Sequence, residues 1–410
     1  MPWSCRRIAV LVAALVPVAS VAADWPQWRG PARDGLIAGL APRASWPDVL
    51  RPGWKVTVGI GHSSPVVVGD RVFLFSRVGD EEVVQALDLA TGKSLWRQSY
   101  AAPYTMNMAA TSHGKGPKST PVVDAGRVFT LGIGGTLSAF DAGSGRVLWR
   151  KEFASQFKET TPLYGTAMSP IVDEGRLIAH VGGSGGGSFT AFDPATGSAL
   201  WAWKGDGPGY SSPVVAELAG VRQYVTFTES SLVGVSAAKG ELLWKLPFTT
   251  SWVQNAVTPV VHGDLVIYSG LDHPVKAARI VRKGTAYAVE PVWENAEVAS
   301  YMSTPVLVAG RLCGFSHRKK GQFFCLDPAT GKTLWLSEGR QGENAALVAG
   351  AGSLFALTDS SELLVANPAA STFAVQKRYD VAGSPTWAHP VVLPDGVLVK
   401  DALTLALLKF

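Results

Sequence analysis

The sequence predicts an all-β fold, an eight-bladed β-propeller of four-stranded antiparallel blades, and two recurring features carry this prediction. One is a repeated motif, or phrase, of the form Ala-x-Asp-x-x-Thr-Gly-x-x-Leu-Trp. Ser144 takes the Thr position in one copy, and Cys325 takes the Ala position in another. Its clear copies are Ala86–Trp96, Ala139–Trp149, Ala191–Trp201 and Cys325–Trp335, and a weaker copy ends at Lys239–Trp244. The other is a hydroxyl residue followed by proline. Self-similarity at intervals of roughly 40–50 residues is typical of propellers and solenoids.

The Ser/Thr-Pro pair opens each unit, and the first unit shows the pattern that follows it. An apolar strand Pro65–Val68 leads through Gly69–Arg71 to a second strand, Val72–Ser76. A third strand ends at Asp88, and a fourth begins at Trp96. Short β-rich runs separated by Gly and Asp indicate an all-β fold, and four such strands make one blade. The pairs are Ser64-Pro65, Thr120-Pro121, Ser169-Pro170, Ser212-Pro213, Thr258-Pro259 and Thr304-Pro305.

The remaining blades are less regular. The fifth, Pro259–Trp293, lacks the Asp and Thr-Gly positions, and the seventh, Asn344–Tyr379, has Ala345-Ala346 in place of Ser-Pro. The chain ends with three strands that lack a fourth: Pro390–Leu393, Gly396–Lys400 and Leu403–Leu408. The segment Trp54–Val58 is an unpaired outer strand that would complete this blade and leave no sheet edge open. We therefore expect eight blades, with seven as the alternative.

The tryptophan that ends each phrase is expected to be structural. Asp88 can accept hydrogen bonds from the turn beyond it, and Gly92 supplies a positive φ. Trp96 then lies on the outer strand, where its indole can fill the gap between two blades. We expect this docking role for Trp96, Trp149, Trp201, Trp244, Trp293 and Trp335.

The N-terminus has the pattern of a secretory signal peptide. Arg6 and Arg7 precede an apolar run, Ile8–Val21, that ends in small residues near Ala23. The expected organisation is a signal peptide at 1–23, an N-terminal arm at 24–52 and one propeller domain at 53–410. We expect cleavage, export to the periplasm or medium, and a soluble, monomeric mature protein without a transmembrane segment.

Charge and cysteine usage exclude some classes of function. The formal net charge is +5 and the charges are scattered, without the basic stripe and aromatics that nucleic-acid binding requires. Two cysteines, Cys313 and Cys325, flank the predicted hairpin Arg318–Gly321 and face each other across neighbouring strands. They are expected either as a disulfide or as two buried free thiols. Metal-ligand spacing of Cys and His is absent from the sequence, and no metal is predicted.

The repeated phrase resembles the tryptophan-docking repeat of quinoproteins and of the outer-membrane assembly factor BamB, a resemblance that covers nearly all of the mature chain. Trp25–Pro31 also looks like the N-terminal segment of exported pyrroloquinoline quinone (PQQ) repeat proteins, and we expect an arm that packs its two tryptophans on the propeller. Quinoprotein dehydrogenases bind PQQ and calcium, whereas BamB-like members bind no cofactor. This chain is shorter than the dehydrogenases and lacks their vicinal cysteines. It also lacks the lipoprotein cysteine of BamB.

A site is expected where loops enter the innermost strands and ring a central funnel. The candidate ligand-binding residues are His62, His113, Lys118, Tyr210, Trp252, Asn255, Tyr301, Glu343, Asn344, Trp387 and His389. The loop Ala101–Lys118 is either a functional loop or a solvated excursion.

No catalytic constellation stands out, so we expect a non-catalytic, BamB-like binding or scaffold protein without a cofactor, whose partner is an envelope protein or glycan. The alternative is a PQQ- and calcium-dependent dehydrogenase of alcohols or sugars, with calcium ligands drawn from Glu159, Glu343 and Asn344. A carbohydrate-active enzyme would need paired carboxylates, which are too few near the funnel.

Overall fold

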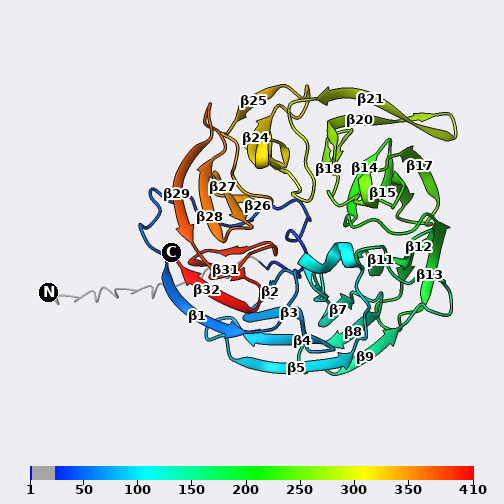
Figure 1. Cartoon of the computed structure of the whole chain (residues 1–410), viewed down its shortest axis with the longest axis horizontal. Coiled ribbons are helices and arrows are strands. Elements are labelled where there is room, and N and C mark those ends of the chain that lie inside the picture. Colours follow the sequence, from blue (N-terminus) through cyan, green and yellow to red (C-terminus); the bar gives the residue numbers. More distant parts are fainter. Residues whose placement is uncertain (2–23) are drawn as a thin grey trace.

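The chain folds into a ring of eight four-stranded sheets, shown in Figure 1. This computed structural model describes residue 1 and residues 24–410. The predicted signal peptide at 1–23 lies almost entirely outside the described residues. The predicted architecture is confirmed, including the count of eight blades and the four antiparallel strands in each.

The first four blades follow the predicted order, each with its first strand innermost. Blade 1 contains β2 (Val66–Val68), β3 (Arg71–Val78), β4 (Glu81–Asp88) and β5 (Ser94–Ala101). Blade 2 contains β6 (Val122–Asp124), β7 (Arg127–Leu131), β8 (Leu137–Asp141) and β9 (Val147–Lys151). Blade 3 contains β10 (Ile171–Asp173), β11 (Arg176–Gly183), β12 (Gly186–Phe192) and β13 (Ala199–Gly205). Blade 4 contains β14 (Val214–Leu218), β15 (Val221–Phe227), β16 (Ser231–Ser236) and β17 (Leu242–Pro247).

The degenerate blades keep the same architecture. Blade 5 contains β18 (Val260–His262), β19 (Leu265–Gly270), β20 (His273–Lys283) and β21 (Ala286–Asn295). Blade 6 contains β22 (Val306–Val308), β23 (Arg311–Ser316), β24 (Gln322–Leu326) and β25 (Thr333–Leu336). Blade 7 contains β26 (Ala345–Gly350), β27 (Ser353–Thr358), β28 (Glu362–Asn367) and β29 (Ala374–Asp380).

Blade 8 closes the ring with strands from both ends of the chain. It contains β30 (Val391–Leu393), β31 (Gly396–Lys400), β32 (Thr404–Lys409) and, outermost, β1 (Arg51–Thr57). β1 pairs antiparallel with β32, and Trp54 lies opposite Leu407. The prediction that an N-terminal strand completes the last blade is therefore confirmed.

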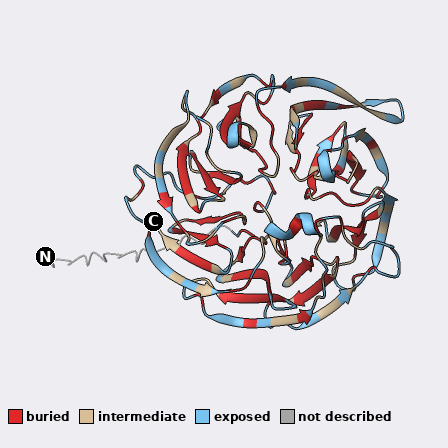
Figure 2. Cartoon of the chain, in the orientation of Figure 1, coloured by how far each residue is buried: buried red, intermediate tan, exposed pale blue. Residues whose placement is uncertain are grey.

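Burial follows position within a blade, as Figure 2 shows. The two middle strands are buried along most of their length, whereas outer strands such as β13 are largely exposed or half-buried. The hydrophobic clusters span neighbouring blades: Phe73 and Phe75 of blade 1 pack with Phe140 of blade 2. The core is thus a series of layers between sheets, which bury the apolar faces that a single blade would leave in water.

Each of several tryptophans lies over the turn of the next blade. Trp96 Nε1 donates to the carbonyl oxygen of Ala142 at 3.0 Å, and its indole covers Gly145. A Cβ at Gly145 would lie 2.5 Å from the ring, so the turn needs glycine for space as well as for its φ of 74°. The indoles of four further tryptophans cover turn glycines in the same way: Trp54 covers Gly92, Trp149 covers Gly197, Trp201 covers Gly240 and Trp293 covers Gly331. Trp54, Trp149 and Trp293 also donate to a carbonyl oxygen of that turn, whereas Trp201 Nε1 has no hydrogen-bond partner among the described residues.

Two tryptophans differ because the next blade lacks that turn. Trp244 Nε1 donates to Gln223 Oε1 within its own blade, and Trp335 packs against Phe373, with 5.5 Å between ring centroids. The contribution of these contacts to stability stays a prediction.

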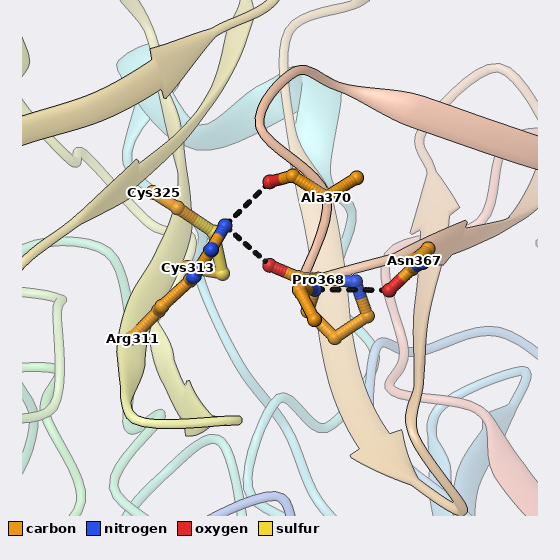
Figure 3. The surroundings of a disulfide bond; sticks show 7 residues. Arg311, Cys313, Cys325, Asn367, Pro368 and Ala370 are labelled. Carbon is orange, nitrogen blue, oxygen red and sulfur yellow. Dashed lines mark hydrogen bonds between the residues drawn. A yellow bond between two sulfur atoms is a disulfide. The ribbon is translucent and has the colours of Figure 1, made fainter.

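Cys313 and Cys325 are joined as a disulfide between β23 and β24, where they are register partners with Cα atoms 4.1 Å apart. Both side chains are buried in the layer between blades 6 and 7. In Figure 3, Arg311 reaches from the same blade to the carbonyl oxygens of Pro368, at 3.0 Å, and Ala370. This arginine therefore ties blade 6 to the turn of blade 7, beside the disulfide.

Helices are short 3₁₀ segments in the described residues: η1 (Met108–His113), η2 (Ser251–Val253) and η3 (Arg318–Lys320). In residue 1 and residues 24–410, we find no helix with the length and hydropathy that crossing a bilayer demands.

Candidate functional site

A central cavity of ≈ 210 Å³ lies where the loops from outer strands enter the inner strands of the next blades. Its wall combines aromatic rings, hydroxyl groups, two amides and one ammonium group. The structure brings eight of the predicted site residues together in this wall: His62, His113, Lys118, Tyr210, Tyr301, Asn344, Trp387 and His389.

Three predicted site residues lie elsewhere. Asn255 is buried, and its amide donates to the carbonyl oxygens of Thr228 and Phe248, so it holds a loop rather than facing the cavity. Trp252 lies in η2 and is 70% exposed. Glu343 lines an adjoining groove of ≈ 850 Å³, which shares Tyr301 and Met302 with the cavity. The spacing from the Ser/Thr-Pro mark located the loops, but it could not give the direction of each side chain.

The N-terminal arm supplies a cavity residue that sequence reasoning missed, Trp28. Figure 1 shows the blue N-terminal segment entering the centre of the ring. Trp25 bridges to Val67 of blade 1 and is 3% exposed. The two tryptophans of Trp25–Pro31 are the available signal, but their pattern predicts packing on the propeller and does not by itself place Trp28 in the cavity wall. Tyr164 also lines the wall and was not predicted.

Two buried arginines hold the arm in place. Arg29 donates to the carbonyl oxygens of Thr304, at 3.0 Å, and Pro305, at 2.7 Å. On blade 3, Arg33 donates to the carbonyl oxygens of Ser169 and Pro170, both at 2.9 Å. Their guanidinium carbons lie 5.5 Å and 5.6 Å from the Trp28 ring centroid, within the range of cation–π contact. The arm therefore connects blade 3 to blade 6 across the centre of the ring and holds the indole in the cavity wall.

The hydroxyl residues of the Ser/Thr-Pro pairs are joined by hydrogen bonds from blade to blade, and we call this series the belt. The hydroxyl of one pair accepts a backbone N–H from the equivalent position of the preceding blade, as Thr120 Oγ1 does from Ser64 at 3.1 Å. The belt continues to Thr304 and is closed at the other end by His389 N, which donates to Ser64 Oγ at 2.8 Å. The acceptors are Ser64, Thr120, Ser169, Ser212, Thr258 and Thr304.

Blade 7 interrupts this belt because Ala345-Ala346 carries no hydroxyl. Ser303 Oγ takes over there, accepting from Ala345 N at 3.1 Å and donating to Asn344 Oδ1 at 2.6 Å. All six hydroxyl residues of the belt line the cavity. Since each hydroxyl oxygen already accepts an N–H, its own proton is available to a ligand.

The loop between blades 1 and 2 lies over the cavity. Its helix η1, cyan in Figure 1, lies near the centre of the ring, and Ala109 and His113 contribute to the wall. Asn107 caps this helix, because its Oδ1 accepts from Ala109 N at 2.9 Å. His62 Nε2 lies 2.9 Å from the carbonyl oxygen of His113, so the loop is attached to blade 1.

Burial decides the charge of the titratable groups in the wall. It lowers the pKa of His62 to about 3 and that of His389 to about 3, so both imidazoles are neutral at pH 7. It also lowers the pKa of Lys118 to about 8, where the ammonium form still prevails at neutral pH. Lys118 Nζ donates to the carbonyl oxygen of Tyr164 at 2.6 Å.

The residues present do not fit calcium. The cavity wall holds no Asp or Glu, although calcium prefers several carboxylate and carbonyl oxygens. Of the three ligands considered from sequence, Asn344 lines the cavity, Glu343 lies in the neighbouring groove and Glu159 lines neither. Over residue 1 and residues 24–410, no three His, Cys, Asp or Glu side chains gather as metal ligands would.

Ring architecture and repeat together define a propeller of the PQQ-repeat class. The chain belongs to the family described as outer membrane protein assembly factor BamB, whose family model matches residues 79–337. BamB of Yersinia pestis is 25% identical over 370 residues, which cover 85% of each chain. Methanol dehydrogenase [cytochrome c] subunit 1 of Paracoccus denitrificans is 26% identical over 257 residues, and the match spans 60% of this chain and 38% of that protein.

The solved structures support the same fold. A europium-containing methanol dehydrogenase superposes with a TM-score of 0.67 at 14% identity, covering 95% of this chain and 98% of that one. At this identity the similarity concerns the fold alone, and function must be argued from the site.

Proposed function

We propose that this protein is an exported, non-catalytic binding or scaffold propeller of the cell envelope, which acts through its funnel face. The observation that carries the proposal is the composition of the cavity wall. Aromatic, hydroxyl, amide and ammonium groups suit binding, whereas calcium chemistry would need carboxylates that the wall does not provide. Burial keeps His62 and His389 neutral, with pKa values of about 3 that are too low for general acid–base catalysis near pH 7. Membership of the BamB family supports an envelope partner.

An exposed residue two positions from the cavity residue Gln254 offers a direct test of this function. A photo-crosslinking amino acid at Trp252 (70% exposed) should capture one discrete envelope partner in cells of the source organism. The same group at Leu95, which is 48% exposed on an outer strand, is the matched control. Equal products at both positions, or none at Trp252, would count against a partner at the funnel face.

Export is part of the proposal. The segment 1–23 would be removed, and N-terminal sequencing of protein recovered from the periplasm or medium should begin at Asp24. Recovery of full-length protein from the cytoplasmic fraction alone would contradict export.

The second candidate is a PQQ- and calcium-dependent dehydrogenase, favoured by the similarity to methanol dehydrogenases. Titration of the purified protein with PQQ and Ca²⁺, measured by calorimetry and by the melting temperature, distinguishes the dehydrogenase from the scaffold proposal. We expect no calcium-dependent binding, since the wall lacks carboxylate ligands. Calcium-dependent binding together with oxidation of an alcohol or sugar by an added electron acceptor would replace the scaffold proposal with this one.

A further inference from the structure

Near the centre of the ring are buried cations that form no ion pair with the described residues, although Asp34 and Asp401 act on Arg29 and Lys400 from a longer distance. Arg29 and Arg33 are 1% and 2% exposed, and their guanidinium groups donate to backbone carbonyl oxygens and to one side-chain amide oxygen. Lys400, 1% exposed, donates only to the carbonyl oxygens of Gly59 and Asp401. None of these three, nor Lys118, has a carboxylate within 4 Å in the described part of the chain.

Buried charges are normally paired, because leaving water costs an unpaired ion much of its solvation energy. Of these four cations, Lys118 lines the cavity itself. Its ammonium has three donors, of which one goes to Tyr164, so two remain for a ligand. An anionic group in the cavity would complete the charge balance.

One buried polar atom in the wall also lacks a partner. His389 is 9% exposed, lines the cavity, and its Nδ1 makes no hydrogen bond to the described residues. An unpaired buried nitrogen is costly unless a ligand or water satisfies it. The cavity is therefore complementary to a ligand that carries both an anionic group and neutral hydrogen-bonding groups.

The belt restricts what the neutral part of that ligand can be. In these blades the backbone N–H of the residue before the proline is taken by a belt hydroxyl, and the proline itself has no N–H, so a peptide would find few backbone donors at these positions for strand-like recognition. The groups left free are hydroxyl protons, which suit the oxygen-rich edge of a sugar. The indoles of Trp28 and Trp387 supply apolar ring faces in the same wall.

We propose that the funnel binds a sugar acid, with its carboxylate at Lys118 and its hydroxyl groups at the Ser/Thr belt. The inference rests on the proposed binding function and names the ligand class of that site. A free sugar acid and the acidic terminal residue of an envelope glycan share this chemistry, and the experiment separates these sources.

The test is calorimetric titration of the full mature protein with glucuronate and with glucose, which differ only in the group at one ring position. Glucuronate should bind at least tenfold more tightly than glucose. An oligosaccharide ending in a uronic acid then distinguishes the sources: tighter binding than the monomer indicates a glycan end, and equal binding indicates the free acid. Titration with an acetylated Asp/Glu-rich peptide tests the alternative ligand class, an acidic peptide.

Lys118→Gln should reduce glucuronate affinity at least tenfold without changing affinity for glucose, and Lys118→Arg should restore part of it. Lys115→Gln is the matched control, since Lys115 lies exposed in the same loop and does not line the cavity. Melting temperatures of the variants show that each is folded.

Equal affinity for glucose and glucuronate, no effect of Lys118→Gln, binding of the peptide alone, or no binding of either uronate ligand would overturn the proposal. Those results leave the crosslinking and PQQ–calcium experiments unaffected, so failure of the ligand class and failure of the binding function are distinguishable.

Discussion

Replacement of Trp96 by alanine should weaken the contact between blades 1 and 2 and destabilise the ring. The indole is 9% exposed, donates to Ala142 and covers Gly145. Truncating a buried tryptophan to alanine typically costs about 3–5 kcal/mol of unfolding free energy. The lost hydrogen bond contributes about 1 kcal/mol within that range, because Ala142 O is left without its indole donor.

The same loss can be expressed as a change in melting temperature. An unfolding entropy of about 2.1 cal/mol/K per residue, over residues 24–410, amounts to roughly 0.8 kcal/mol/K if the ring unfolds as one unit. A loss of about 4 kcal/mol therefore lowers the melting temperature by about 5 °C. Differential scanning calorimetry of wild type and variant measures this directly.

Leu95→Ala is the matched control, because Leu95 precedes Trp96 on β5 but is 48% exposed. It should change the melting temperature by less than about 1 °C, since surface substitutions typically stay within about 0.5 kcal/mol. If Trp96→Ala melted with the wild type and the Leu95 control, docking by this tryptophan would have no role in stability.

Three further predictions concern space, cross-linking and protonation. Gly145→Ala should destabilise more than Gly126→Ala, because both glycines have a φ of 74° but only the first would place its Cβ against an indole; equal melting temperatures would argue against the contact. Replacing Cys313 and Cys325 together by alanine should lower the unfolding free energy by about 2–4 kcal/mol in urea titration, and dithiothreitol should then affect only the wild type. His389 is neutral when folded, with a pKa of about 3, but titrates near 6.5 when unfolded, so stability is lost as pH falls below 6.5. The loss is about 1.4 kcal/mol per pH unit, and His389→Gln should show a shallower decline between pH 6.5 and 5; an identical decline would contradict the assignment.

Much of the site's location could be predicted from the sequence, since the Ser/Thr-Pro marks place the loops that enter the inner strands. His62, Lys118 and Trp387 lie in the cavity wall for that reason. Asn255 lies one position further from its proline, and it points elsewhere because its amide donates to three carbonyl groups of neighbouring loops. Spacing fixes where a backbone enters the funnel, whereas the rotamer depends on partners that are distant in sequence.

The sequence by itself determined the blades, their number and the closure of the ring. These properties repeat, because most blades pack against their neighbour with the same turn, glycine and tryptophan. Only the tertiary structure decided what fills the centre. Arg29 meets Thr304 across 275 positions of sequence and Arg33 meets Pro170 across 137, so no local periodicity records either contact. The unneutralised charge around Trp28 and Lys118 arises there because residues from the arm and several blades converge on one axis.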